Sequence, residues 1–341
     1  MKSTSPRFEF KCAPFGLVAA LVFLGCNGSD RGKWELIHSE GSPHAASVGP
    51  ILFDSEEKGW TLTWAQLSRV RDQGRTWTPV LTNQNGQRAF YSFTFKNSMS
   101  GVVVGTQRKG DAYTVLILHT SDGGVNWEES ATDVKAESDR DKRPALFSVS
   151  FCGEKSGWAV GENLILHTVD GGLTWQTQRI EVNGERLSTV GCNSSERAWA
   201  AGTGGLVLKT SDGGNTWTRQ EVGTKDILMQ IRFFGENGWM VGGTDGKPLL
   251  LRTRDRGDTW DTQQLNITAG LFDIFFIGNR GWIVGEKGTI LASDDGGQTW
   301  LSQDSPTREN LTCLFFLSTN QGWAGGDRLT LLRFSDRSVS K

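Results

Sequence analysis

An eight-residue stretch, Thr210-Ser211-Asp212-Gly213-Gly214-Asn215-Thr216-Trp217, decides the fold of this chain, because it recurs along the sequence. The full pattern has a hydroxyl residue first, Asp third, Gly fifth, and Thr-Trp at the end. Residues 168–175 and 293–300 keep all of these positions. The pattern predicts a tight turn between two strands, because the carboxylate accepts bonds from turn N–H groups and glycine adopts positive φ. The Trp then opens the next strand and buries a large ring.

Three further copies drift from this pattern. Residues 253–260 carry Arg256 in place of the middle glycine, residues 120–127 carry Asn126 in place of the threonine, and residues 70–77 begin with Val70. The pattern resembles the Asp box, also called the bacterial neuraminidase repeat, and this resemblance implies a fold more than a function. We assign a structural, turn-capping role to the aspartates of the six copies, which are Asp72, Asp122, Asp170, Asp212, Asp255 and Asp295.

A second marker, Gly-Trp-apolar-apolar-Gly, precedes each of these turns, as in residues 157–161. Complete or altered copies begin at residues 59, 101, 157, 198, 238, 281 and 322, so that seven copies stand against six turns. The count balances if residues 32–37 supply the outer strand of the last unit from the other end of the chain. The spacing of 40 to 56 residues is typical of four-stranded propeller blades.

We therefore predict an all-β fold, a seven-bladed β-propeller over residues 34–341 whose ring is closed by the N-terminal strand completing the last blade. One blade illustrates the expected strands, at residues 146–152, 158–161, 164–168 and 175–180. We expect both tryptophan series to pack in the core between blades. The charged residues 128–144 are expected to form a solvated loop, although a partner contact is also open.

The N-terminal segment has the features of an export signal. Its apolar residues 15–24 end in Leu24-Gly25-Cys26, which resembles a bacterial lipobox. The resemblance implies a lipoprotein signal peptide over residues 1–25, lipidation of Cys26, and a tether over residues 26–33. Asn27 after the cysteine favours the outer membrane. The alternative is an ordinary secretory signal with an incidental cysteine. The cations before the apolar run are Lys2, Arg7 and Lys11.

The composition fits an exported β-repeat protein. The chain has a net charge of −2, which argues against nucleic-acid binding, and its 43 glycines and 14 tryptophans favour a repeat array. We expect the propeller to be a monomer. The lipid anchor would make the membrane its first partner.

No catalytic constellation is evident from the residues. A sialidase needs an arginine triad, a Tyr–Glu nucleophile pair and an aspartate acid/base, but this chain has only two tyrosines. Tyr91 alternates with Phe93 and Phe95, so we expect it to pack. His119 and His167 stand at equivalent repeat positions without metal-like spacing. We predict no catalytic residues, no metal site and no cofactor.

Cys152 and Cys192 occupy nearly matching positions on the inner strands of adjacent blades. An oxidising envelope would permit a disulfide between them. The odd cysteine count of the mature propeller, which also contains Cys313, and the strand-interior setting favour free buried thiols. We therefore expect free thiols.

Loops that lead from an outer strand to the next inner strand open on the face that carries the mouth of the central channel. In five of the seven blades these loops place a cation just before the inner strand. A ring of such cations around the channel mouth could attract an anionic partner or ligand. The alternative, which we favour, is that these long side chains only solvate loop ends beside Glu185, Asp226 and Glu309. The cations just before the inner strands are Arg88, Arg143, Arg186, Lys225 and Arg308.

With its seven Gly-Trp strands, degenerate Asp boxes and lipobox, the mature chain resembles the photosystem II stability/assembly factor family and its bacterial relatives. Members of that family are non-enzymatic propellers that bind assembly intermediates of membrane proteins. The resemblance implies a lipid-anchored envelope scaffold with a protein partner. Two alternatives stay open: a glycan-active enzyme, either a sialidase-like hydrolase or a lyase, and a carbohydrate-binding surface protein.

Overall fold

The structure is a computed structural model that describes residues 32–40, 46–139 and 143–336. The predicted signal peptide, the lipidation site at Cys26 and most of the tether lie outside these residues. Within the described part of the chain, no helix is both long and apolar enough to cross a bilayer.

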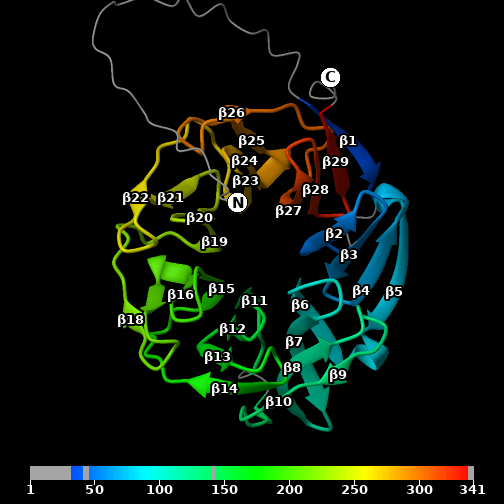
Figure 1. Ribbon diagram of the computed structural model, residues 1–341, viewed down its shortest axis with the longest axis vertical. Helices are drawn as coiled ribbons and strands as arrows, with labels where there is room; N and C mark the ends of the chain where they lie inside the picture. The colour runs from blue at the N-terminus through cyan, green and yellow to red at the C-terminus, as the bar shows by residue number, and fades with distance from the viewer. Residues whose placement is uncertain (1–31, 41–45, 140–142, 337–341) are drawn as a thin grey trace, which may run out of the picture. The chain divides into compact units, whose positions relative to one another are not determined.

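The described residues form a ring of seven sheets around a central channel (Figure 1). This confirms the prediction of an all-β seven-bladed propeller. The first three blades consist of β2 (Ile51–Ser55), β3 (Lys58–Thr63), β4 (Gln66–Arg71) and β5 (Thr76–Thr82); β6 (Arg88–Phe95), β7 (Gly101–Lys109), β8 (Ala112–Thr120) and β9 (Glu128–Glu129); and β11 (Ser148–Cys152), β12 (Ser156–Gly161), β13 (Leu164–Thr168) and β14 (Thr174–Gln178), with β10 (Ala131–Thr132) beside β14.

The remaining four blades follow the same order from the inner to the outer strand. They consist of β15 (Leu187–Cys192), β16 (Ala198–Gly202), β17 (Val207–Thr210) and β18 (Thr218–Arg219); β19 (Leu228–Phe234), β20 (Asn237–Gly242), β21 (Leu249–Thr253) and β22 (Asp261–Thr262); β23 (Leu271–Ile277), β24 (Arg280–Gly285), β25 (Ile290–Ser293) and β26 (Leu301–Ser302); and β27 (Leu311–Ser318), β28 (Gln321–Gly326) and β29 (Leu331–Ser335) with β1 (Lys33–His38). Four one-turn 3₁₀ helices lie in the connections, at Asp72–Gly74, Gln84–Gly86, Thr203–Gly205 and Glu286–Gly288.

The two chain ends close the ring as predicted. Strand β1 pairs antiparallel with β29, and Trp34 stands opposite Phe334 in this register. The outer strand of the seventh blade therefore comes from the start of the propeller, which ties the first blade to the last. This pairing leaves no blade with a missing outer strand.

Blade three departs from the expected four strands. The charged loop of residues 128–144 contributes β9 to blade two and then β10, which pairs parallel to β14. Within the same loop, Glu137 exchanges backbone hydrogen bonds with Tyr113. The loop is thus partly built into the outer rim, because its backbone groups find strand edges to pair with.

The two sequence markers interlock neighbouring blades. The tryptophans of the Gly-Trp strands are buried, with Trp158 and Trp199 fully excluded from solvent. The ring of Trp199 packs under the Asp-box turn of the next blade, where a Cβ added to Gly257 would lie 2.4 Å from it. Gly257 also has a φ of +86°. Only glycine satisfies both demands, so each marker requires the other across a blade junction.

The two cysteines of blades three and four form a disulfide, so the expectation of free thiols was wrong. Cys152 ends β11, Cys192 ends β15, and their Cα atoms are 6.0 Å apart. The inner strands of adjacent blades run side by side in matching register, which brings the two side chains within bonding reach. Among the described cysteines, Cys313 is free and buried.

Candidate functional site

Chain direction divides the loops between two faces of the ring. The Asp-box turns join third strands to outer strands, and they lie on the face opposite the turns between second and third strands. The connections from an outer strand to the next inner strand share the face of those second-to-third turns. We call this second face the mouth face, and it carries residues 63–65 and the start of β6.

The Asp-box carboxylates are occupied within their own turns. Asp212 accepts bonds from the Thr216 amide at 2.9 Å, the Thr216 hydroxyl at 2.6 Å and the Thr210 hydroxyl at 2.8 Å. The hydroxyl of Thr210 in turn accepts the amide of Gly214 at 2.9 Å. The Thr216 bonds lower the pKa of Asp212 to about 2. Asp122, Asp170, Asp255 and Asp295 make equivalent bonds.

The first Asp box differs from the others because it lacks the leading hydroxyl residue. Asp72 accepts the hydroxyl of Thr76 at 2.7 Å, and the turn adopts a 3₁₀ conformation in which Asp72 itself has a φ of +52°. The leading hydroxyl therefore decides which turn geometry forms.

The five cations expected near the channel mouth have different surroundings. Arg88 pairs with Glu129 at 3.1 Å, and Arg186 lies 3.5 Å from Glu162. The guanidinium of Arg143 lies 4.5 Å from the ring centre of Tyr113. Lys225 and Arg308 are exposed. Their joint attraction of an anionic partner stays a prediction.

A cavity of about 470 Å³ opens on the mouth face, lined by blades one and two, by residues 46–49 before β2 and by Thr312 of blade seven. Its floor is apolar, formed by Val48, Leu62 and Phe90, and its rim carries Trp64 and Tyr91. Trp64 is 55% exposed and Tyr91 is 37% exposed, although Tyr91 also packs edge-on against Phe147. Tyr91 therefore packs as expected on one side, while its exposed part remains free to contact a ligand or partner in the cavity.

One of the predicted cations, Arg143, lies near this aromatic rim. Burial raises the pKa of Tyr91, and the positive charge of nearby Arg143 partly offsets this shift. The rim thus places an apolar cavity, two exposed aromatic rings and a cation close together.

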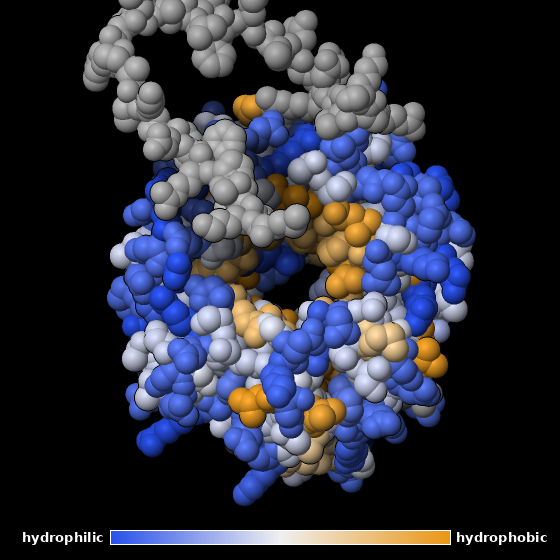
Figure 2. Space-filling view, in the orientation of Figure 1, coloured by the Kyte–Doolittle hydropathy of each residue, from blue (hydrophilic) through white to orange (hydrophobic). Residues whose placement is uncertain are grey.

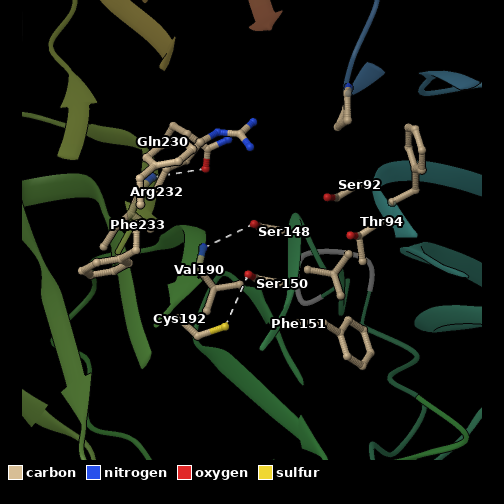
Figure 3. A pocket seen from close by; sticks show the side chains of 16 residues that line it. Ser92, Thr94, Ser148, Ser150, Phe151, Val190, Cys192, Gln230, Arg232 and Phe233 are labelled. Atoms are coloured by element: carbon tan, nitrogen blue, oxygen red, sulfur yellow. Dashed lines mark hydrogen bonds between the residues drawn. The ribbon is translucent and has the colours of Figure 1, made fainter. Parts of the chain in front are cut away.

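The channel wall holds a second cavity, of about 310 Å³, which is lined by the inner strands of blades two to five (Figure 3). Its lining is polar, and the side chains of Ser92, Thr94, Ser148 and Gln230 face the space between the strands. Figure 2 shows the hollow at the centre of the ring, with apolar residues gathered around it and hydrophilic ones at the periphery.

Arg232 on β19 contributes the charge of this lining, and Asp273 on β23 of the next blade holds it. The guanidinium donates to both carboxylate oxygens, from Nε at 3.0 Å and from Nη2 at 3.1 Å. Asp273 follows a bulge in β23, which turns its side chain toward the neighbouring inner strands. Its side chain is 2% exposed, whereas that of Arg232 is 33% exposed.

Sequence reasoning missed Trp64, Arg232 and Asp273. A signal for the last two was present, because each is the one charged residue of a largely apolar inner strand, and a buried charge requires a partner. No such signal existed for Trp64, since a tryptophan in this chain is usually a core residue. Across the described ranges, no group of three or more His, Cys, Asp or Glu side chains could hold a metal ion.

Comparison with known proteins gives the same fold. A structure described as "YCF48 bound to D1 peptide" is 23% identical, with a TM-score of 0.66, over 89% of this chain and 96% of the other. YCF48 from Cyanidioschyzon merolae is 20% identical, with the same TM-score, over 89% and 98% of the two chains. A GH74 enzyme from Niastella koreensis is 15% identical, with a TM-score of 0.68, over 88% of this chain and 53% of its own. These likenesses show the fold alone.

The family comparison is more specific than the structural one. No curated protein matches this chain significantly. The sequence profile of the family described as "Photosynthesis system II assembly factor YCF48" matches overlapping stretches that cover well over half of the chain, at residues 74–189, 137–226, 178–268, 217–305 and 266–335. The resemblance that the repeats indicated is confirmed, and the chain belongs to the photosynthesis system II assembly factor YCF48 family.

Proposed function

We propose that this protein is a non-enzymatic, lipid-anchored scaffold of the bacterial cell envelope that binds a protein partner during assembly or stabilisation of a membrane-protein complex. The observation that carries the proposal is the mouth-face cavity, where Trp64 and Tyr91 remain exposed above an apolar floor. Large exposed aromatic rings with a polar surround are typical of protein-binding surfaces.

The chemistry of the two cavities supports a binding role over a hydrolytic one. A glycosidase needs a pair of carboxyl groups facing the substrate. The residues that line the mouth cavity and the channel cavity include no aspartate or glutamate. Asp273 lies behind the channel wall with both oxygens engaged.

Family membership supports a protein as the partner. The YCF48 neighbour of the described structure is bound to a D1 peptide. By analogy, we expect a polypeptide segment of a membrane protein to lie against the mouth face. Whether the complex is photosynthetic depends on the membrane in which the protein acts.

The partner is tested by affinity purification from native membranes, with identification of the co-purifying proteins. We expect one membrane-protein complex to be enriched with the wild type and lost with a Trp64→Ala/Tyr91→Ala variant. The matched control is Leu301→Ala, because Leu301 is similarly exposed, at 49%, but lies on the outer strand of blade six. Equal recovery with all three proteins, or turnover of a glycan by the purified protein, would contradict the scaffold proposal.

The contribution of the predicted cations is tested separately. Charge reversal of Arg143, Arg186 and Arg308 together should weaken recovery of the same partner if the ring attracts it. Unchanged recovery would mean that these side chains only solvate loop ends.

The anchor is tested at Cys26. We expect Cys26→Ala to abolish incorporation of radiolabelled palmitate and to move the protein from the membrane fraction to the soluble fraction. Retention of both properties would overturn the lipid anchor.

A further inference from the structure

The channel cavity contains one charged side chain, Arg232, among the residues that line it. Figure 3 shows this side chain reaching into the space between the strands, across from Ser92 and Thr94. The other lining residues are apolar or uncharged, so no carboxylate in the lining competes for the guanidinium from the channel side.

Arg232 is only partly used by its partner. A guanidinium has five N–H donors in a fixed planar arrangement. Asp273 takes two of them, the Nε–H and one Nη2–H, along one edge of the group. The three remaining donors have no hydrogen-bond partner among the described residues, and the side chain is 33% exposed. The free edge formed by Nη1 and Nη2 is therefore available from the channel.

Asp273 cannot serve as a partner for anything else. Its Oδ1 also accepts the amide of Ile274 at 2.8 Å, and its Oδ2 accepts the amide of Leu314 at 2.8 Å. Leu314 belongs to blade seven, so the pair connects three consecutive blades. Asp273 is thus a buried, fully bonded support that fixes the direction of the arginine.

Gln230 adds a second oriented group beside the arginine. Its side-chain oxygen accepts the hydroxyl of Thr189 at 2.7 Å and the amide of Ile231 at 3.2 Å. These two bonds set the rotation of the amide group. Its nitrogen has no protein acceptor in the described part of the chain and faces the same cavity.

We propose that this cavity binds a carboxylate, with the free Nη1–Nη2 edge of Arg232 donating two parallel hydrogen bonds to its oxygens and Gln230 donating a third. A planar monoanion matches the planar edge of a guanidinium. A phosphate dianion fits less well, because Asp273 already offsets the charge of Arg232 and the lining contains no second cation. This site lies apart from the mouth-face cavity of the proposed function and does not depend on it.

The proposal is tested with N-acetylglycine as the probe, N-acetylglycinamide as its neutral counterpart, and inorganic phosphate. The readout is the ¹H–¹⁵N signal of the Arg232 Nε–H and of the Gln230 side-chain amide during titration. We expect N-acetylglycine to shift both signals, and the affinity obtained from its titration to be at least tenfold higher than that of either other probe.

Substitution of Arg232 alone would leave Asp273 buried without its counter-ion, so the test variant is Arg232→Gln/Asp273→Asn. Its matched control is Arg197→Gln/Asp258→Asn, which removes an ion pair between blades four and five outside the channel. Circular dichroism checks that both variants fold. We expect the affinity for N-acetylglycine to fall about tenfold or more in the first variant and to stay unchanged in the control.

A pentapeptide acid, N-acetyl-tetraalanyl-glycine, distinguishes the sources of the carboxylate. Tighter binding than N-acetylglycine indicates the end of a polypeptide, whereas equal or weaker binding indicates a small free acid; both support the site. Equal binding of the acid and the amide, or unchanged affinity in the Arg232 variant, would overturn the proposal. If the test variant does not fold, the wild-type comparison of acid and amide decides alone.

Discussion

Removal of the Cys152–Cys192 disulfide is expected to lower the free energy of unfolding by about 4 kcal/mol. The bond joins two inner strands that are 40 residues apart in sequence. In the chain-entropy description, closing a loop of that length removes about 13 cal/mol/K from the unfolded chain, which is about 4 kcal/mol at 25 °C. Among the described residues, the one hydrogen bond that involves these two sulfur atoms is the long contact of 3.8 Å between the Ser150 hydroxyl and the Cys192 sulfur, so the effect arises mainly in the unfolded state.

The assay is urea unfolding followed by tryptophan fluorescence, since the blade tryptophans are buried in the folded protein. We expect the urea midpoint to fall by roughly 1.3 M, if unfolding depends on urea with a slope of about 3 kcal/mol/M. Oxidised wild type, wild type with reductant, and a Cys152→Ala/Cys192→Ala variant are compared. The urea midpoint of the variant should equal that of the reduced wild type and should not change when reductant is added.

Two results would refute this reasoning. Oxidised and reduced wild type could have the same midpoint, which would mean that the bond does not constrain the unfolded chain. Alternatively, mass spectrometry of the protein purified from its native cells could find both thiols free, which would mean that the two cysteines do not pair there.

Four further predictions concern the turns and the core. Because its turn holds the pKa of Asp212 at about 2, against an ordinary value of 3.8, the Asp212 contribution to stability should be complete above about pH 4 and lost as the pH falls toward 2. In urea titrations at pH 7, Asp212→Asn should lower the free energy of unfolding by about 1 kcal/mol, and Asp72→Asn should lower it less, because the turn of Asp72 has a different geometry. Equal losses would contradict this difference between the turns. Because burial raises the pKa of the Cys313 thiol, this residue should react with a disulfide reagent at pH 8 only after unfolding, and rapid labelling of folded protein would contradict its burial. Trp158→Ala should cost about 3 to 5 kcal/mol, whereas Trp64→Ala should stay within about 0.5 kcal/mol by the same titration.

Most of the architecture was predictable because both repeat markers act locally. A turn of the Thr210 to Trp217 type caps itself through its own carboxylate and hydroxyl groups, so the sequence pattern and the geometry coincide. The closing strand was predictable because a missing unit at one chain end had to be supplied by the other, and β1 does pair with β29.

The candidate site was less accessible to sequence reasoning. The cations Arg88 and Arg186 were identified from their place before inner strands, but their carboxylate neighbours Glu129 and Glu162 lie elsewhere in the sequence. Tyr91 was expected to pack because of its alternation with phenylalanines. It lies at a bulge in β6, however, where the pairing with β7 shifts between Phe90 and Ser92, and its ring stays partly exposed.

The sequence by itself determined the number of blades, the identity of the turns and the way the ring closes, since each depends on contacts within about ten residues or on simple counting. Only the tertiary structure decided which distant side chains meet. Cys152 bonds to Cys192, and Asp273 orients Arg232, because the inner strands of successive blades lie side by side. The repeat pattern places the two cysteines at nearly matching positions, but the strand register around the channel decides whether their side chains bond and which charge faces Arg232.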